Sequence, residues 1–216
     1  MQTVTASEQM IEQQVRAWDV LDGRVLDAMR TVPRELFVPE SQRYRAFADA
    51  EVPLAHGQHM LRPSVAGRVL QALLPQPAEQ VLEIGTGSGF LSACLARLAA
   101  RVHTVELYPA LAEAARGNLA SAGLRSVDVL EADALRMNGG ADYDAIAVTA
   151  SLPIYLPRFE RMLSVGGRLF IAVGEAPAME ARLVTRSGPD TWQVQSLFET
   201  VIDPLVNSVR PPEFTF

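Results

Sequence analysis

The feature that most constrains this chain is a short apolar run followed at once by three closely spaced glycines. Residues 81–84 read VLEI, residues 85–89 read GTGSG, and a helical pattern begins at Phe90. This order predicts a buried strand, a tight loop and the N-terminus of a helix. In an open α/β fold, such a loop is where a nucleotide-like cofactor lies against bare backbone.

The spacing of the glycines narrows the choice of cofactor. A dinucleotide fingerprint needs a glycine where this chain has Phe90, and the lysine of a phosphate-binding loop is absent. Glu83, just before the loop, would repel a pyrophosphate but suits a cationic ligand. S-adenosylmethionine carries a sulfonium and an ammonium and no phosphate, so we predict that loop 85–89 cradles its methionine end. A glycine-rich turn without a ligand is the alternative interpretation.

Acidic residues follow two further predicted strands. Glu106 ends the run 101–106 and lies about 20 residues past the glycine loop, where the acid that binds ribose hydroxyls is expected. A carboxylate accepts from both hydroxyls of a ribose through charge-assisted bonds. Asp133 follows the run 127–130. It either accepts a hydrogen bond from the adenine amino group or caps the end of a strand or helix, and spacing alone favours neither.

The chain from residue 80 onward alternates between short apolar runs and helical patterns. Such alternation predicts a Rossmann-like α/β fold with a doubly wound, mostly parallel sheet covered on both faces. Two later runs, 181–186 and 191–198, alternate apolar and polar residues and predict an antiparallel C-terminal strand pair. The other strands are expected at residues 81–84, 102–106, 127–130, 145–149 and 168–173, and the helices at 90–100, 110–122 and 153–163.

The carboxyl ends of the parallel strands mark the expected binding edge. Ligands in open α/β sheets bind outside the C-terminal ends of the strands. Four loops are therefore expected to converge there, at residues 85–89, 106–108, 131–134 and 149–152.

An N-terminal helical extension precedes the sheet. Apolar residues at three- and four-residue steps between Glu8 and Met29 predict two short helices, with Asp22 as the N-cap of the second. A further helix is expected to begin at Ser64, with the serine as its cap.

Length and composition limit the number of domains, the kinds of partner and the cellular location that the chain can have. The length suits one domain, 1–216, in which 1–62 form the N-terminal helices and a loop on the substrate and cofactor side, and 63–216 form the cofactor-binding sheet. The net charge of −6 argues against nucleic acid as a partner, which needs a basic face. The single cysteine, Cys94, excludes a disulfide framework and indicates a cytoplasmic protein. No apolar stretch approaches the roughly 20 residues that span a membrane.

Six motifs occur in order along the chain: VPRELFVP at 32–39, GQ at 57–58, VLEIGTGSG at 81–89, TVE at 104–106, YDAI at 143–146 and GGRL at 166–169. Together they resemble those of the protein-L-isoaspartate O-methyltransferases. The resemblance implies a class I methyltransferase fold and an enzyme that uses S-adenosylmethionine to esterify the α-carboxylate of L-isoaspartyl residues in damaged proteins. The ester then cyclises to a succinimide, which allows return to aspartate and so repairs the protein.

The resemblance also completes the predicted cofactor site. It adds the loop after the GQ motif to the residues that were predicted from their position at the ends of the strands. The predicted cofactor-binding residues are Met60, Leu61, Glu83, Gly85, Thr86, Gly87, Ser88, Gly89, Glu106, Leu107, Asp133 and Ala134.

The chain departs from the family pattern at one position that bears on catalysis. The family's loop after GQ reads roughly TISQP, with the serine in the active site, whereas this chain reads HMLRP and has Leu61 at the serine position. A leucine side chain forms no hydrogen bond, so Ser64, Arg62 or His59 would have to substitute for the serine. Alanines also flank Asp133 where the family has glycines.

Three functions stay open on the sequence alone. The chain is an isoaspartyl carboxyl methyltransferase, a methyltransferase of the same lineage with another acceptor, or a cofactor-binding protein without isoaspartyl turnover. The expected partner is a protein or peptide that carries isoaspartate, or a small-molecule acceptor. No metal is expected, because His56 and His59 have no cysteine or carboxylate at ligand spacing.

Overall fold

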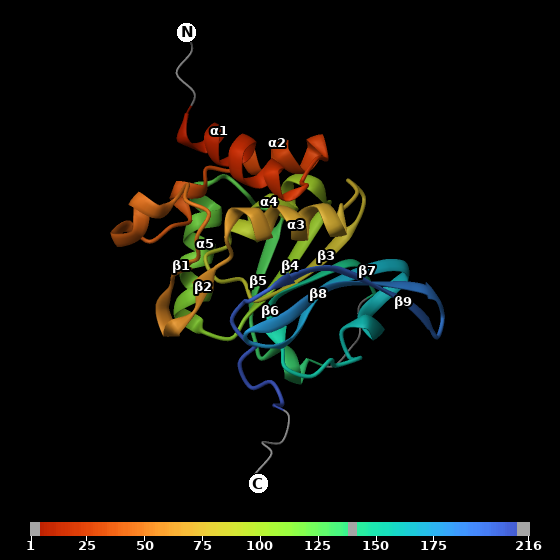
Figure 1. Ribbon diagram of the computed structural model, residues 1–216. Coiled ribbons are helices and arrows are strands. Elements are labelled where there is room, and N and C mark those ends of the chain that lie inside the picture. The colour runs from red at the N-terminus through yellow and green to blue at the C-terminus, as the bar shows by residue number, and fades with distance from the viewer. Residues whose placement is uncertain (1–4, 138–141, 211–216) are drawn as a thin grey trace.

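The computed structural model describes residues 5–137 and 142–210, and its centre is a seven-stranded sheet (Figure 1). The strand order is β5-β4-β3-β6-β7-β8-β9. Neighbours from β5 to β7 run parallel, whereas β8 and β9 are antiparallel additions at one edge. The strands are β3 (Gln80–Ile84), β4 (Arg101–Glu106), β5 (Val127–Glu131), β6 (Tyr143–Leu152), β7 (Leu163–Glu175), β8 (Ala178–Gly188) and β9 (Thr191–Thr200).

The predicted sheet is confirmed, including the antiparallel C-terminal pair. Strand β3 lies at its centre, where Glu83 is in register with Thr104 of β4 and Ala147 of β6. This placement brings the carboxyl ends of β3, β4, β5 and β6 to a single edge. Strands β6 and β7 are longer than predicted, and β7 continues past the predicted end at residue 173 to Glu175, because it pairs with β8 as far as Ala178.

The helices cover one face of this sheet. They are α1 (Ala6–Met10), α2 (Gly23–Thr31), α3 (Pro63–Leu73), α4 (Phe90–Leu98) and α5 (Pro109–Ser121). Figure 1 shows α1 to α4 stacked above the sheet, with the N-terminal helices outermost. A buried cluster joins them to the strands through residues such as Met29, Leu70, Leu95, Val81 and Phe170.

The opposite face is covered without an α-helix in the described ranges. The helix predicted at 153–163 is wrong: turns lead into a 3₁₀ helix at Glu160–Met162. Pro157 lies inside the segment, and a proline removes a helical N–H and clashes with the preceding turn. The apolar residues that suggested a helix are still used, since Phe159 and Met162 are buried against this face of the sheet.

The N-terminal helices follow the prediction in part. The Asp22 side chain caps α2, accepting from the backbone N–H groups of Arg24 (2.9 Å) and Val25 (3.3 Å). The first helix continues from α1 through a π-helical turn and a 3₁₀ turn to Trp18.

The predicted cap of α3 is wrong. Arg62 occupies the N-cap, Pro63 the first turn, and Ser64 is fully buried inside the helix. The proline explains the shift, because its missing N–H and fixed φ suit the first helical position. Asp49 performs the capping instead and accepts from both the backbone N–H and the hydroxyl of Ser64 (2.9 and 2.8 Å).

The C-terminal tail returns to the binding edge after β9. Ser151, near the end of β6, donates its N–H to the carbonyl of Asp203 and accepts from the N–H of Leu205, both at 2.8 Å. The Ser151 hydroxyl adds a bond to the Ile202 carbonyl at 3.2 Å. The tail is therefore fixed across the loops that follow the parallel strands. Within residues 5–137 and 142–210, no helix combines the length and apolar character needed to cross a membrane.

Arg168 joins the end of α3 to the sheet. Its guanidinium donates to the carbonyls of Leu73, Leu74 (3.0 Å) and Asp144 (2.9 Å) and forms two bonds to Glu79 at 2.8 and 2.7 Å. Only 15% of the arginine side chain is exposed. This single fork therefore satisfies the last carbonyls of the helix and fixes it against β6 and β7.

The Arg168→Lys substitution is expected to lower the free energy of unfolding by about 2–3 kcal/mol, because an ammonium cannot reproduce the planar fork. Chemical denaturation measures the change. The matched control is Arg101→Lys, whose pair with Asp128 is exposed on both sides (59% and 47%). The control is expected to cost less than about 1 kcal/mol. Equal losses for the two variants would contradict the structural assignment of Arg168.

Candidate functional site

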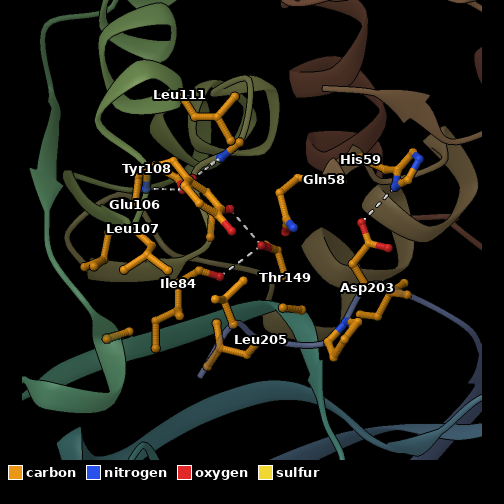
Figure 2. Close-up of a pocket in the computed structure, with 18 of the residues that line it drawn as sticks. Gln58, His59, Ile84, Glu106, Leu107, Tyr108, Leu111, Thr149, Asp203 and Leu205 are labelled. Carbon is orange, nitrogen blue, oxygen red and sulfur yellow. Dashed lines mark hydrogen bonds and ion pairs between the residues drawn. The ribbon is translucent and has the colours of Figure 1, made fainter. Parts of the chain in front are cut away.

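A cavity of about 750 Å³, here called the main pocket, lies at the carboxyl ends of the parallel strands. The four segments expected to converge all contribute to it, although residues 149–152 are the end of β6 and not a loop. The loop that contains β2 (His59–Met60) and the C-terminal tail complete it (Figure 2). Its lining residues include Glu51, Gln58, His59, Met60, Leu61, Ile84, Gly85, Gly87, Glu106, Leu107, Tyr108, Leu111, Asp133, Ala134, Thr149, Asp203 and Leu205.

A smaller cavity of about 370 Å³, the side pocket, adjoins the main one. It adds residues that lie deeper under the glycine loop, among them Arg34, Glu83, Thr86, Ser88 and Phe90. The residues that line both pockets are His59, Met60, Leu61, Gly85, Gly87 and Thr149. These six residues, here called the junction, form the boundary between the two cavities.

The glycine loop is shaped by positive backbone angles and by close neighbours. Gly85 has φ of +95°, and a Cβ at this position would lie 2.5 Å from the Thr149 hydroxyl oxygen. That hydroxyl lies within hydrogen-bond distance of the carbonyls of Ile84 (2.9 Å) and Gly85 (2.7 Å), to which it donates. The loop therefore presents backbone to the pocket, as a closely approaching ligand requires. Gly89, in contrast, lines neither pocket and occupies the N-cap of α4.

Glu83 is a buried carboxylate with one unpartnered oxygen. Its Oε2 accepts from the hydroxyls of Thr104 (2.7 Å) and Ser92, while Oε1 is buried and has no hydrogen-bond partner. Burial raises the pKa of Glu83 to about 7, and the two hydroxyl donors only partly oppose this effect. Thr86 bonds in turn to the Thr104 hydroxyl at 2.7 Å. The free acceptor beside the glycine loop is suited to a cationic donor such as an ammonium group.

Glu106 fastens two of the loops to each other. Its Oε2 accepts from the N–H of Gly87 (2.9 Å) and its Oε1 from the N–H of Tyr108 (3.0 Å). The carboxylate is 5% exposed and lines the main pocket. Because each oxygen retains acceptor capacity, a pair of ribose hydroxyls fits this position. Leu107 lines the same wall.

Asp133 meets the pocket from the end of β5 and also caps a local helix. Its Oδ1 accepts from the N–H of Leu135 (2.9 Å), which starts the 3₁₀ helix Ala134–Arg136. Its Oδ2 accepts from the side chain of Asn207 in the tail at 3.1 Å. The capping interpretation is therefore correct. Ligand binding remains compatible with it, because each carboxylate oxygen has a second lone pair.

The three residues proposed as substitutes for the family serine have separate environments. His59 belongs to the junction, and its Nδ1 lies 2.9 Å from Oδ2 of Asp203. Ser64 is bonded to Asp49, as described above, and the guanidinium of Arg62 lies 5.9 Å from the ring centre of Trp18. Neither Ser64 nor Arg62 lines the main or side pocket, whereas Leu61 lines both.

Several pocket residues had not been assigned from the sequence. Tyr108 and Thr149 lie in segments that were expected to converge, Thr149 within β6 rather than in a loop, but their partners were not predicted. The Tyr108 ring stacks on His56 at 4.2 Å between ring centres, which braces the wall of the main pocket. Asp203 carried no local signal, since it contacts the pocket only through pairing of the tail with β6.

Arg34 was part of a sequence motif without an assigned contact. It is 1% exposed, lies over the Phe90 ring, and donates to the carbonyls of Ala46 and Leu61, both at 3.0 Å. Burial lowers the pKa of its guanidinium to about 10. Its bond to Leu61 fixes the backbone of the loop that carries the junction residues.

Comparison with known proteins identifies the family of the chain. The model of the family Protein-L-isoaspartate(D-aspartate) O-methyltransferase matches residues 5–210. The protein-L-isoaspartate O-methyltransferase of Rhodopseudomonas palustris is 41% identical over 201 residues, which cover 92% of each chain. That of Aeropyrum pernix is 42% identical over 186 residues, which cover 84% of this chain and 71% of its own.

Solved structures confirm the fold. A Plasmodium falciparum protein described as a protein-L-isoaspartate O-methyltransferase, in complex with S-adenosyl-L-homocysteine, superposes with a TM-score of 0.82. The match covers 92% of this chain and 97% of that one at 19% identity. The family match and the extended sequence identity decide the assignment: the chain belongs to the protein-L-isoaspartate O-methyltransferase family, whose members are S-adenosylmethionine-dependent enzymes.

Proposed function

We propose that this protein transfers a methyl group from S-adenosylmethionine to the α-carboxylate of L-isoaspartyl residues in damaged proteins. The observation that supports this most directly is that the glycine loop lines two adjoining pockets, with Glu106 in the main pocket and Glu83 in the side pocket. These groups suit a cationic nucleoside donor, and the family of the chain is named for the isoaspartyl acceptor. The ester that forms cyclises to a succinimide, which opens again to aspartate. We place this repair activity in the cytoplasm, where the buried thiol of Cys94 stays reduced.

The pocket residues fit the parts of the donor in order. Asp133 and Ala134 lie where the adenine would be held, and Glu106 with Leu107 where the ribose would be. The unpartnered Oε1 of Glu83 and the backbone of loop 85–89 suit the methionine end. A wall with Glu51, Glu106 and Asp133 favours a cation by its charge.

The methyl transfer proposed here requires no proton transfer by the protein. The sulfonium supplies an electrophilic methyl group when the donor is bound. An acceptor carboxylate with a pKa near 4 is ionised at neutral pH and needs no general base. The chain has instead to align the acceptor with the methyl group and to exclude water. Junction residues Met60 and Leu61 provide an apolar boundary suited to excluding water.

A second function is favoured by one specific observation. Leu61 presents an apolar side chain at the junction, and Ser64 and Arg62 do not line either pocket. A methyltransferase of the same lineage with a different acceptor, or a cofactor-binding protein without isoaspartyl turnover, would also show this arrangement.

An isoaspartyl peptide and its normal aspartyl twin are expected to separate these functions. With donor labelled at the methyl group, only the isoaspartyl peptide is expected to gain base-labile label. Its chain continues through the side-chain carboxyl group of the residue, which leaves the α-carboxylate free, whereas in the aspartyl peptide the α-carboxyl group is part of the peptide bond. Scintillation counting before and after mild base measures the ester. Donor binding in calorimetry with no label on either peptide would support the second function instead.

Donor binding is expected to depend on the ionisation of Glu83. Because burial raises the pKa of Glu83 to about 7, the neutral acid predominates below that pH in the free protein. An ammonium partner favours the anion, so affinity for S-adenosylhomocysteine should rise by about tenfold from about pH 6 to about pH 8. Titration calorimetry at both pH values measures the change.

The Glu83→Gln variant is expected to bind more weakly and to lose the part of this pH dependence that Glu83 contributes. Titration of the ligand's own amino group is common to both proteins, so the comparison removes it. Glu113→Gln, on the exposed side of α5 (81% exposed side chain), is the matched control and should behave as the wild type. The same pH dependence in all three proteins would contradict the assignment of Glu83.

Restoring a hydroxyl at the junction is expected to improve turnover. The Leu61→Ser variant should lower the KM for the isoaspartyl peptide by about tenfold, the effect of one regained hydrogen bond. Leu61→Ala is the matched control, because it removes the same bulk without adding a hydroxyl. Steady-state kinetics on both variants measures the difference. Equal KM values for the serine and alanine variants would mean that any effect comes from the smaller side chain and not from the hydroxyl.

A further inference from the structure

The junction offers a single ionisable side chain to an acceptor. Gly85 and Gly87 contribute backbone, Met60 and Leu61 are apolar, and the Thr149 hydroxyl is engaged with the carbonyls of Ile84 and Gly85. His59 is the remaining member. Because the junction separates the cavity suited to the nucleoside from the one under the glycine loop, a group placed there is close to the reacting methyl.

Two anchored segments hold the imidazole of His59. Its backbone lies in β2, which pairs with β1 (Val52–Pro53) in the register Pro53 with His59. Its Nδ1 lies 2.9 Å from Oδ2 of Asp203, and Figure 2 shows the two side chains facing each other across the edge of the main pocket. The backbone of Asp203 is fixed in turn by its bond from Ser151.

This pairing leaves one ring nitrogen available. The Asp203 carboxylate accepts the Nδ1–H, so a carboxylate bound at Nε2 would be held by the doubly protonated ring. In the part of the chain that the structure describes, Nε2 of His59 has no recorded hydrogen bond. The free Nε2–H of an imidazolium is a charge-assisted donor, the stronger kind for a carboxylate.

Charge in the pocket makes such a donor necessary for an anionic acceptor. Glu51, Glu106, Asp133 and Asp203 all line the main pocket and favour a cationic donor. The same acids repel a second carboxylate that approaches the methyl group. His59, beside Asp203, is the junction side chain that can present an N–H donor to such a carboxylate.

A groove leads from outside to this position. Gly57, Gln58, Arg210 and the tail residues 203–208 line an open cavity of about 700 Å³, which shares Gln58 and residues 203–206 with the main pocket. A peptide segment lying in this groove would reach the junction on the side of His59 and Asp203.

We propose that His59, oriented by Asp203, binds the carboxylate of the methyl acceptor through Nε2 and so performs the task for which Leu61 has no hydroxyl. The inference rests on the proposed function, since it takes an isoaspartyl carboxylate as the acceptor. His59 contacts the acceptor directly, and Asp203 is a positioning residue that acts through the imidazole.

Kinetics on ring variants tests the proposal. His59→Phe keeps the ring volume but has no nitrogen, and should raise the KM for an isoaspartyl peptide about ten- to a hundredfold. His59→Gln keeps a neutral donor and should recover part of that loss, while Asp203→Asn should fall between wild type and His59→Phe. In both His59 variants the dissociation constant for S-adenosylhomocysteine should change far less than the KM for the peptide. His103→Gln, whose ring bonds to Tyr143 at 3.0 Å, is the matched control.

A binding measurement separates this proposal from the proposed function. In protein saturated with S-adenosylhomocysteine, the imidazole ¹⁵N signals of His59 should shift on adding an isoaspartyl peptide, but not a peptide in which that carboxylate is an amide. A shift without methyl ester in the labelled assay would support the inference and contradict isoaspartyl turnover. Methyl ester with an unchanged KM in His59→Phe, or no His59 shift with either peptide, would overturn the inference.

Discussion

The site depends on the Glu106 carboxylate, which accepts one N–H from the glycine loop and one from the loop after β4. Each bond satisfies a backbone donor that would otherwise lie unpaired at a partly buried strand end. The two loops are thereby fixed to each other. The Glu106 carboxylate is oriented before any ligand arrives, because its own hydrogen bonds set its rotamer.

The acidic side chains of the pocket act in opposite ways on its two proposed ligands, the cationic methyl donor and the anionic acceptor. Buried acids favour the donor's positive charges, and the raised pKa of Glu83 reflects the free energy of holding a carboxylate there without a cation. An anionic acceptor faces the opposite problem at the same place. In our proposal the pair of His59 and Asp203 addresses it locally, because Asp203 orients the imidazole so that it can present a directed donor.

Short sequence patterns predicted the strands of the sheet correctly. They failed where tertiary packing, and not local helix propensity, sets the backbone conformation. The strands and the Asp22 cap follow from patterns a few residues long, as do the acids at the ends of β3, β4 and β5. Apolar residues do recur at helical spacing in 153–163, but Pro157 prevents a helix. The segment forms turns instead, and its apolar side chains are still buried. The Ser64 cap failed because Asp49, distant in sequence, supplies the capping oxygen.

The sequence by itself determined the cofactor side of this protein, because a strand, a glycine loop and a terminal acid are encoded within single βα units. The acceptor side that we propose follows only from the tertiary structure. His59 and Asp203 are 144 residues apart and meet because the tail pairs with Ser151 after the sheet has formed. Such a contact leaves no periodicity or spacing in the chain, since it is set by the order of the strands and the path of the tail across them.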